Sequence, residues 1–165
     1  MAIPVVTIIG KSKAGKTTLM EKMIGELKAR GYRIGTLKHH SHAGFDVDKP
    51  GKDSWRHARA GSEHVIIAAP DKIASYRLLA EEMSFDQILK EFSAVDLILV
   101  EGYKSAHQPS LEVVREEIGL TLISDPDQRL AIAADVDLEV DVPVFDLNDV
   151  DSLADLVEST YLENK

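Results

Sequence analysis

The sequence predicts an α/β fold in which helices cover both faces of a mostly parallel sheet, with a β-hairpin added. Segment 3–9 is continuously apolar and β-branched, as a strand buried on both faces should be, and segment 95–100 is predicted to be the second strongly buried strand. Strand-like and helix-like segments alternate along most of the chain, which is typical of parallel sheets with crossover helices. Segment 64–78 instead holds two strand-like runs around Pro70-Asp71, which indicates a hairpin.

The segment after the first strand has the pattern of a helix with one apolar face. Leu19, Met23 and Leu27 recur at four-residue spacing, and Gly31 follows as a typical C-terminal stop. Residues 32–38 are then predicted to form the second strand.

A polar segment and a short helix follow. Residues 39–53 are too polar and too rich in turn-forming residues for a helix or a strand, so they are predicted to form a loop. A short helix that ends at Gly61 comes next, with Asp53 or Ser54 as its cap.

The second half of the chain completes the alternation. Ser84 and Gln87 have the spacing of a capping box ahead of a short helix. Further strands and a closing amphipathic helix are expected at 111–115, 130–135, 142–146 and 149–162. Because no repeat, low-complexity tract or linker interrupts these elements, residues 1–165 are interpreted as a single domain.

Composition excludes several classes of function. The net charge of −9 argues against non-specific binding to nucleic acid or to a membrane surface. The chain has no cysteine, so a disulfide framework, a thiolate metal site and a cysteine nucleophile are excluded. The N-terminus lacks a basic region before its short apolar stretch, and no other segment is long enough to span a bilayer. We therefore expect a cytoplasmic protein.

Residues 10–17, GKSKAGKT, match the pattern G-x-x-x-x-G-K-[ST] at every fixed position. Glycines let such a loop turn its N–H groups inward around a phosphate, and the positive end of the following helix points at the same place. The lysine supplies a charge to the β- and γ-phosphates, and the threonine hydroxyl can ligate Mg²⁺. The predicted nucleotide contacts are Gly10, Lys11, Ser12, Lys13, Ala14, Gly15, Lys16, Thr17 and Thr18.

The alternative is an ordinary strand–turn–helix connection with chance glycines. The buried strand before the motif and the helix after it are the context that a nucleotide site requires. The sequence therefore favours a three-layer P-loop NTPase fold.

A second part of the site is expected at the end of strand 95–100. Ligands of open α/β sheets lie at the carboxyl ends of the strands, so Glu101 should lie near Thr17 and help to hold Mg²⁺. Gly102 would let the backbone approach a γ-phosphate, whereas Asp96 should lie at the opposite edge of the sheet. The alternative for Glu101 is a solvated acid at a strand end. Lys16 and Glu101 are the predicted catalytic residues.

The loop 39–53 also opens at the carboxyl edge. A transition-metal site is one interpretation of its histidines and aspartates, although their spacing fits no standard zinc pattern. The other is a polar loop in which Asp46 or Asp48 associates with Mg²⁺. The residues concerned are His39, His40, His42, Asp46, Asp48, Lys49, Lys52 and Asp53.

Four segments together resemble the molybdopterin-guanine dinucleotide biosynthesis adaptor protein B family: GKSKAGKTTL, KHHSHAGFDVDKPGKDSWRHARAG, DLILVEGYK and LEVVR. The first three lie within residues 7–104, and the long second segment is the one that selects this family. The resemblance implies a GTP-binding protein with weak GTPase activity that assists the guanylyltransferase attaching GMP to molybdopterin. Molybdopterin itself is a further candidate partner.

The resemblance also implies roles for particular residues. Gly10, Lys16 and Thr17 would bind GTP phosphates and Mg²⁺, and Asp46 and Glu101 match acidic residues of the family's motifs. Members form homodimers through an extended β-region, for which the hairpin at 64–78 is the candidate. The alternative is an ordinary edge hairpin within the monomer.

Base preference does not follow from a motif, because the chain lacks the guanine-reading Asn-Lys-x-Asp. Asp135 ends another predicted strand, and its carboxylate could accept hydrogen bonds from guanine N1 and N2. The alternative is a strand-terminating acid. Hydrolysis should be slow, because no glutamine has a water-positioning motif around it, and an arginine from a partner could complete the site.

Two other functions remain open from the residues alone. A P-loop kinase for a small metabolite would need an acceptor pocket and usually an arginine-bearing lid. A nucleotide-driven nickel metallochaperone would need a cysteine-containing or histidine-rich ligand set, and only the histidines at 39–42 support it.

Overall fold

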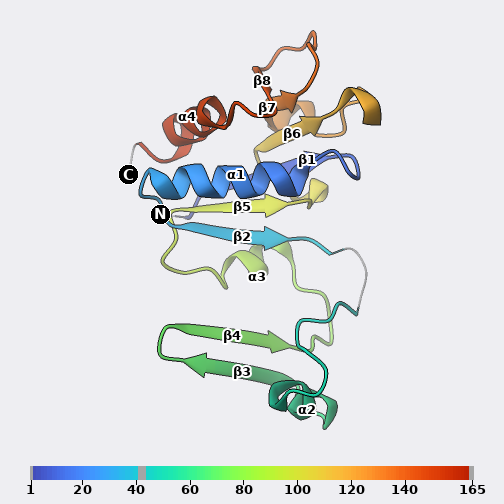
Figure 1. The fold of residues 1–165 in the computed structure, drawn as a ribbon, viewed down its shortest axis with the longest axis vertical. Coiled ribbons are helices and arrows are strands. Elements are labelled where there is room, and N and C mark those ends of the chain that lie inside the picture. Colours follow the sequence, from blue (N-terminus) through green and yellow to red (C-terminus); the bar gives the residue numbers. More distant parts are fainter. Residues whose placement is uncertain (1, 41–43, 164–165) are drawn as a thin grey trace. The chain divides into compact units, whose positions relative to one another are not determined.

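A computed structural model of the chain describes residues 2–40 and 44–163 and divides the chain into two compact units (Figure 1). The first unit combines Met1–His39 with Glu91–Lys165, and the second is His40–Lys90. Residues 1–165 were interpreted as one domain because no linker, repeat or low-complexity tract interrupts the sequence. In the chain, the second unit lies between β2 and β5 of the sheet. Among the described residues, none of the helices combines the length and apolar composition that a bilayer crossing requires.

The first unit is built on a six-stranded sheet in which every neighbouring pair is parallel. The strand order is β2-β5-β1-β6-β7-β8. The strands are β1 Val5–Gly10, β2 Ile34–Lys38, β5 Leu97–Glu101, β6 Ser110–Val114, β7 Arg129–Ala134 and β8 Val144–Asp146. Because all six run in the same direction, their carboxyl ends share one edge of the sheet. The loops that follow the central strands β5, β1 and β6 therefore meet there.

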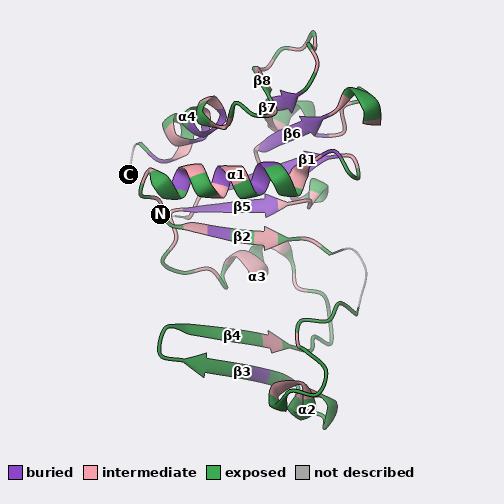
Figure 2. Ribbon diagram, in the orientation of Figure 1, coloured by how far each residue is buried: buried purple, intermediate pink, exposed green. Residues whose placement is uncertain are grey.

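Two helices, α1 (Lys16–Ala29) and α4 (Val150–Tyr161), pack on one face of this sheet (Figure 2). The three apolar residues at four-residue spacing in α1 are all buried in the main core cluster, as predicted. Every residue of β1 is buried, which confirms a strand covered on both faces. In β7, Ala131 and Ala133 face the main cluster, whereas Ile132 and Ala134 belong to a second cluster on the other face.

The second unit contains α2 (Asp53–Arg59), the strands β3 (His64–Ala69) and β4 (Lys72–Arg77), and α3 (Phe85–Leu89). β3 and β4 pair antiparallel, which confirms the hairpin. The capping box is also confirmed: the Ser84 hydroxyl accepts from the Gln87 N–H, and the Gln87 side chain accepts from the Ser84 N–H.

The predicted cap of α2 is wrong. Lys52 occupies the cap position without a side-chain hydrogen bond, and Asp53 is already the first helical residue. An acidic side chain in the first turn still favours the helix through its dipole. The described part of the chain also contains the short 3₁₀ helices η1 (Lys104–Ala106), η2 (Glu116–Ile118) and η3 (Pro126–Gln128).

Candidate phosphate-binding site at the sheet edge

The predicted phosphate loop connects the end of β1 to the start of α1. Gly10 is the last residue of β1, Gly15 is the N-cap of α1, and Lys16 is its first helical residue. Gly15 has a φ of +101°, a left-handed conformation that side chains disfavour. Gly10 is required for another reason, because a Cβ there would lie 2.7 Å from the carbonyl oxygen of Val113 in β6. Both glycines of the motif are therefore dictated by the local backbone.

The N-terminus of α1 is open to an anion. Its N-cap, Gly15, has no side chain to cap it, and the first turn of the helix contains no acidic residue. The first N–H groups of a helix have no acceptor within the helix, and the helix dipole makes this end positive. The loop and helix together thus present the arrangement that binds phosphate groups in proteins.

Lys16 folds across the loop. Its ammonium donates hydrogen bonds to the carbonyl oxygens of Gly10, at 3.1 Å, and Lys11, at 2.8 Å. Lys16 is half-buried, whereas lysines at protein surfaces are usually exposed. Burial lowers the pKa of Lys16, Glu101 opposes that effect, and the positive charges of Lys104 and Lys38 add to the lowering. A phosphate beside this ammonium would favour its charged form.

Thr17 and Glu101 lie together, as the sequence predicted. The Thr17 hydroxyl is 3.1 Å from each carboxylate oxygen of Glu101, which ends β5. Lys38 pairs with Glu101 in the β2–β5 register, and its ammonium lies 3.1 Å from Glu101 Oε1. Hydroxyl and carboxylate oxygens are the ligands that Mg²⁺ prefers, so Thr17 and Glu101 fit such an ion. Asp46 belongs to the second unit, and its association with Mg²⁺ stays a prediction.

The residues after Glu101 turn sharply. Gly102 has a φ of +90° and donates its N–H to the Ile8 carbonyl of β1 at 3.1 Å. Tyr103 also has a positive φ, and its ring stacks on His39 with centroids 4.0 Å apart. Gly102 therefore lies beside the central strand, and its approach to a γ-phosphate stays a prediction.

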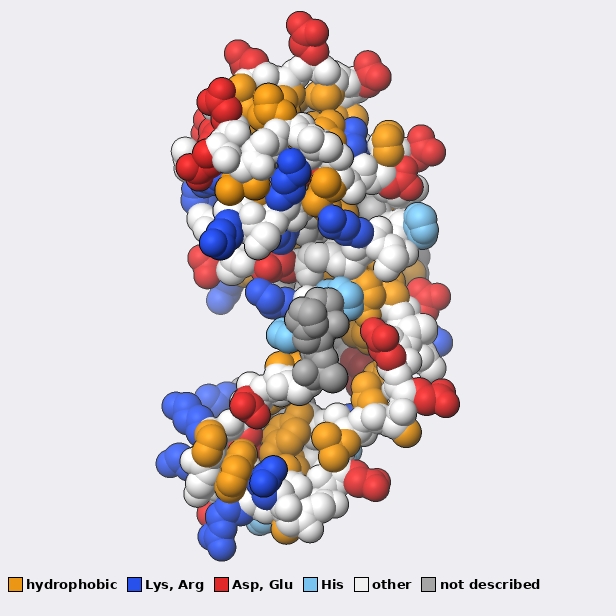
Figure 3. Space-filling view, turned by 90° about the vertical axis from the view of Figure 1, so that its right-hand side faces the viewer, with side chains coloured by type: hydrophobic (Ala, Val, Ile, Leu, Met, Phe, Trp, Pro, Cys, Tyr) orange, Lys and Arg blue, Asp and Glu red, His pale blue; other side chains and the backbone are white. Residues whose placement is uncertain are grey.

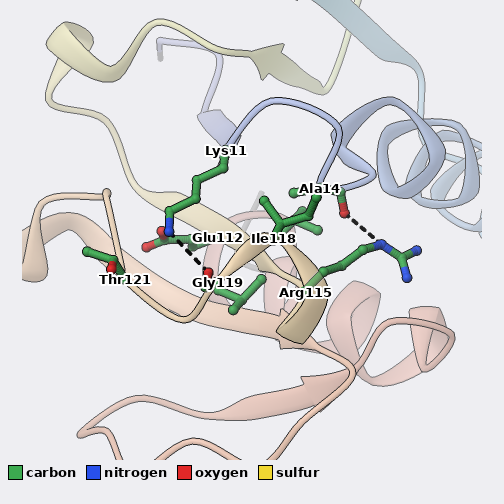
Figure 4. Close-up of a pocket in the computed structure, with 9 residues that line it drawn as sticks. Lys11, Ala14, Glu112, Arg115, Ile118, Gly119 and Thr121 are labelled. Atoms are coloured by element: carbon green, nitrogen blue, oxygen red, sulfur yellow. Dashed lines mark hydrogen bonds between the residues drawn. The ribbon is translucent and has the colours of Figure 1, made fainter.

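Arg115 is a site residue that the sequence analysis missed. It directly follows β6, and its Nε donates to the Ala14 carbonyl in the phosphate loop at 3.1 Å (Figure 4). Lys11 reaches the same region, where its ammonium bonds the Gly119 carbonyl at 3.2 Å (Figure 4). The segment LEVVR was interpreted only as a strand and as part of a resemblance. Its place beside the loop follows from the pairing of Gly10 with Val113, which no local pattern reveals.

Asp135 comes directly after β7, as expected. Its Oδ1 accepts the Glu116 N–H at 2.9 Å, and its Oδ2 lies 3.5 Å from Arg115 Nη1. The carboxylate is therefore in contact with its own chain, and its part in reading a base stays a prediction.

Within the loop 39–53, the Asp48 carboxylate accepts hydrogen bonds from neighbouring residues. Its Oδ1 accepts the Lys49 N–H at 2.8 Å, and its Oδ2 accepts the Tyr76 hydroxyl at 3.0 Å. A hydrogen bond from the Ser54 side chain is the main cause that lowers the pKa of Asp48. Asp48 thereby joins this loop to β4. Within residues 2–40 and 44–163, no group of three His, Cys, Asp or Glu side chains is arranged to hold a metal ion, and His42 lies outside the described residues.

The chain is similar in sequence to two bacterial proteins. The chain is 40% identical to the molybdopterin-guanine dinucleotide biosynthesis adapter protein of Haemophilus influenzae, over 95% of this chain and 89% of that protein. It is also 40% identical to the adapter protein of the same name in Escherichia coli, over 94% of this chain and 91% of that protein.

Solved structures confirm the predicted α/β P-loop fold. The crystal structure of a molybdopterin-guanine biosynthesis protein B matches with a TM-score of 0.73 at 28% identity, covering 94% of this chain and 99% of that one. The crystal structure of Bacillus subtilis MobB matches with a TM-score of 0.75 at 25% identity, covering 98% and 99%. The family model described as molybdopterin guanine dinucleotide synthesis protein B matches residues 5–135, so the chain belongs to this family.

Proposed function

We propose that this protein is a GTP-binding adapter of molybdopterin-guanine dinucleotide biosynthesis with at most slow GTPase activity. The observation that carries the nucleotide part is the complete G-x-x-x-x-G-K-T loop between β1 and α1, with Thr17 against Glu101. The adapter part rests on the family and on the names of the two bacterial relatives. Its proposed partner is the guanylyltransferase that attaches GMP to molybdopterin.

Each part of the site would have a separate role in binding the nucleotide. The loop amides and the N-terminus of α1 would bind the phosphates, and the Lys16 ammonium would contact the β- and γ-phosphates. Thr17 and Glu101 would hold Mg²⁺, which would neutralise charge that develops on the phosphates. The network of phosphate contacts would thus bind GTP tightly without needing fast chemistry.

We expect slow hydrolysis because none of Gln87, Gln108 and Gln128 has the sequence context of a water-positioning residue. Gln87 is engaged in the cap of α3, and the Gln108 amide donates to the Ala106 carbonyl at 3.3 Å. Neither of these two side chains is therefore proposed to position the water that would attack the γ-phosphate. We therefore expect nucleotide binding, rather than turnover, to be the property that an adapter uses.

The test of this proposal is base preference. We expect GTP to bind about tenfold or more tightly than ATP, because a site that hydrogen-bonds guanine leaves its polar groups unpaired against adenine, at roughly 1–3 kcal/mol. Competition of unlabelled GTP and ATP against a fluorescent GTP analogue, with Mg²⁺ present, measures this directly. Equal displacement by the two nucleotides would contradict a GTP-specific adapter.

The hairpin of the second unit is the proposed dimer interface. Ile66, Ile67 and Ile73 are 57%, 47% and 72% exposed, and β3 and β4 form a sheet of only two strands. Figure 3 shows hydrophobic side chains at the surface of this unit. A two-stranded hairpin is marginally stable alone, and an apolar strand edge invites pairing with another chain. A second copy related by two-fold symmetry would pair this edge and cover these side chains.

The dimer proposal predicts twice the chain mass of 18.2 kDa in sedimentation at micromolar concentration. Ile73→Lys should shift the protein to monomer, because it would bury a charge in the interface. Leu120→Lys, which changes an exposed leucine in the first unit, is the matched control and should leave the dimer intact. A wild-type monomer at this concentration would remove the proposal.

A further inference from the structure

The ends of three neighbouring strands bring Arg115 and Asp135 to the phosphate loop. In the sheet, β6 lies between β1 and β7, with Gly10 paired to Val113 and Val114 paired to Ala134. Arg115 and Asp135 are the next residues on β6 and β7, so they leave the sheet side by side. Arg115 contacts the loop, and Asp135 contacts Arg115.

Arg115 makes contact with the loop and with Asp135 at once. Its Nε donates to the Ala14 carbonyl at 3.1 Å, and its Nη1 lies 3.5 Å from Asp135 Oδ2. A Cβ placed on Gly15 would lie 3.5 Å from Nη2, so the guanidinium packs against this residue as well. A planar guanidinium carries several donors in a fixed fork, which lets one side chain hold a carbonyl and face a carboxylate together.

The bond to Ala14 has a consequence for phosphate binding. The peptide between Ala14 and Gly15 is planar and trans, so its C=O and N–H point in opposite directions. Arg115 holds the Ala14 carbonyl toward β6, and the Gly15 N–H is thereby turned away from β6. That N–H is one of the loop amides predicted to bind phosphate.

Asp135 in turn restrains Arg115. One carboxylate oxygen accepts the Glu116 N–H at 2.9 Å, at the start of η2, and the other faces the guanidinium. Both oxygens thus contact the segment that carries Arg115. The carboxylate fixes where this segment leaves β6 and offers the guanidinium a counter-charge.

We propose that Asp135, Arg115 and the Ala14 carbonyl form a clamp that holds the phosphate loop in its binding conformation. Arg115 and Asp135 are positioning residues in this assignment, and Asp135 acts on the nucleotide through Arg115 instead of by reading the base. The inference rests on the proposed function, because a nucleotide is the ligand that the loop would hold. Loss of the clamp should weaken GTP and ATP equally, whereas loss of a base-reading residue should change the ratio of their affinities.

The test measures dissociation constants of Mg-GTP and Mg-ATP by calorimetry, first for the wild-type chain and then for three variants. Arg115→Ala should weaken both nucleotides by the same factor, about tenfold, because the loop amide is no longer held in place. Asp135→Asn should weaken both by a smaller common factor. The double variant should bind no more weakly than Arg115→Ala alone, because the two residues act through one contact.

A matched control separates positioning from general stability. Arg33 and Asp96 form an Arg–Asp pair with a 2.8 Å contact, and both directly precede strands, at the opposite edge of the same sheet. Arg33→Ala should leave both dissociation constants unchanged even where it lowers the unfolding temperature. If Arg115→Ala fails to fold, Arg115→Gln keeps a donor side chain of similar length and should still weaken both nucleotides equally.

Distinct outcomes overturn distinct claims. Wild-type affinities for both nucleotides in Arg115→Ala, or in Arg115→Gln where Arg115→Ala does not fold, would overturn the clamp. Loss of the GTP-to-ATP ratio in Asp135→Asn, with the ratio kept in Arg115→Ala, would also overturn it and assign Asp135 to the base. A wild-type chain that binds neither nucleotide would overturn the proposed function, and this inference with it.

Discussion

Lys16→Ala should abolish the phosphate-dependent part of GTP binding while the fold remains intact. The Lys16 ammonium is the group predicted to bring a full positive charge to the β- and γ-phosphates, and hydrogen bonds to charged groups contribute about 1.5–3 kcal/mol each. The half-buried position of Lys16 strengthens its contact with an anion. Calorimetry with GTP should therefore show a loss of at least about tenfold.

The fold should tolerate this change because Lys16 packs on the loop and not in the core. Its two hydrogen bonds go to the Gly10 and Lys11 carbonyls, and the core cluster does not include it. Lys28→Ala removes the same charge from an exposed position in the last turn of the same helix and is the control. Unchanged GTP affinity in Lys16→Ala, with unchanged circular dichroism, would refute the phosphate-loop assignment.

Glu101→Gln should reduce GTP hydrolysis far more than GTP binding. Glutamine keeps the shape of the side chain and an acceptor for the Thr17 hydroxyl, but it removes the charge that would favour Mg²⁺. Losing partners of a metal site typically costs about 10–100-fold in activity, and we expect a decrease in that range. Binding through the loop amides and Lys16 would persist. Single-turnover hydrolysis and equilibrium binding, measured on the same preparation, separate the two effects.

Asp96→Asn is the control for this experiment. Asp96 directly precedes the same strand, β5, and pairs with Arg33 at the opposite edge of the sheet. Its change removes one carboxylate charge without touching the site, so hydrolysis should stay at the wild-type rate. Asp46→Asn, measured alongside, tests whether the second unit contributes to the same reaction. Wild-type hydrolysis in Glu101→Gln would remove its role in holding the metal.

Local patterns predicted most of the secondary structure. The spacing of Leu19, Met23 and Leu27 in α1 and the turn at Pro70-Asp71 were sufficient, because helix periodicity and turn chemistry depend on neighbours in the chain. The cap of α2 was predicted wrongly, because Asp53 is as favourable in a first turn as at a cap. The division of the chain into two compact units depends on contacts between residues, which composition does not report.

Some parts of the candidate site could likewise be predicted from local sequence, and others depend on contacts between distant residues. The phosphate loop could be predicted from sequence because the motif is eight contiguous residues, and the structure places these residues between β1 and α1. The contact between Thr17 and Glu101 could also be predicted. The carboxyl ends of parallel strands lie at one edge of the sheet, so an acidic residue at the end of β5 lies near the loop that follows β1.

By itself, the sequence determined the fold class and the family resemblance and predicted the phosphate loop, since each rests on short motifs and periodic patterns. Only the tertiary structure decided that Arg115 holds the Ala14 carbonyl and that Asp135 contacts Arg115. Ala14 and Arg115 are 101 residues apart in the chain. They meet because β6 lies beside β1, and the lateral order of parallel strands is set by how helices and side chains pack on the sheet, which no local pattern encodes.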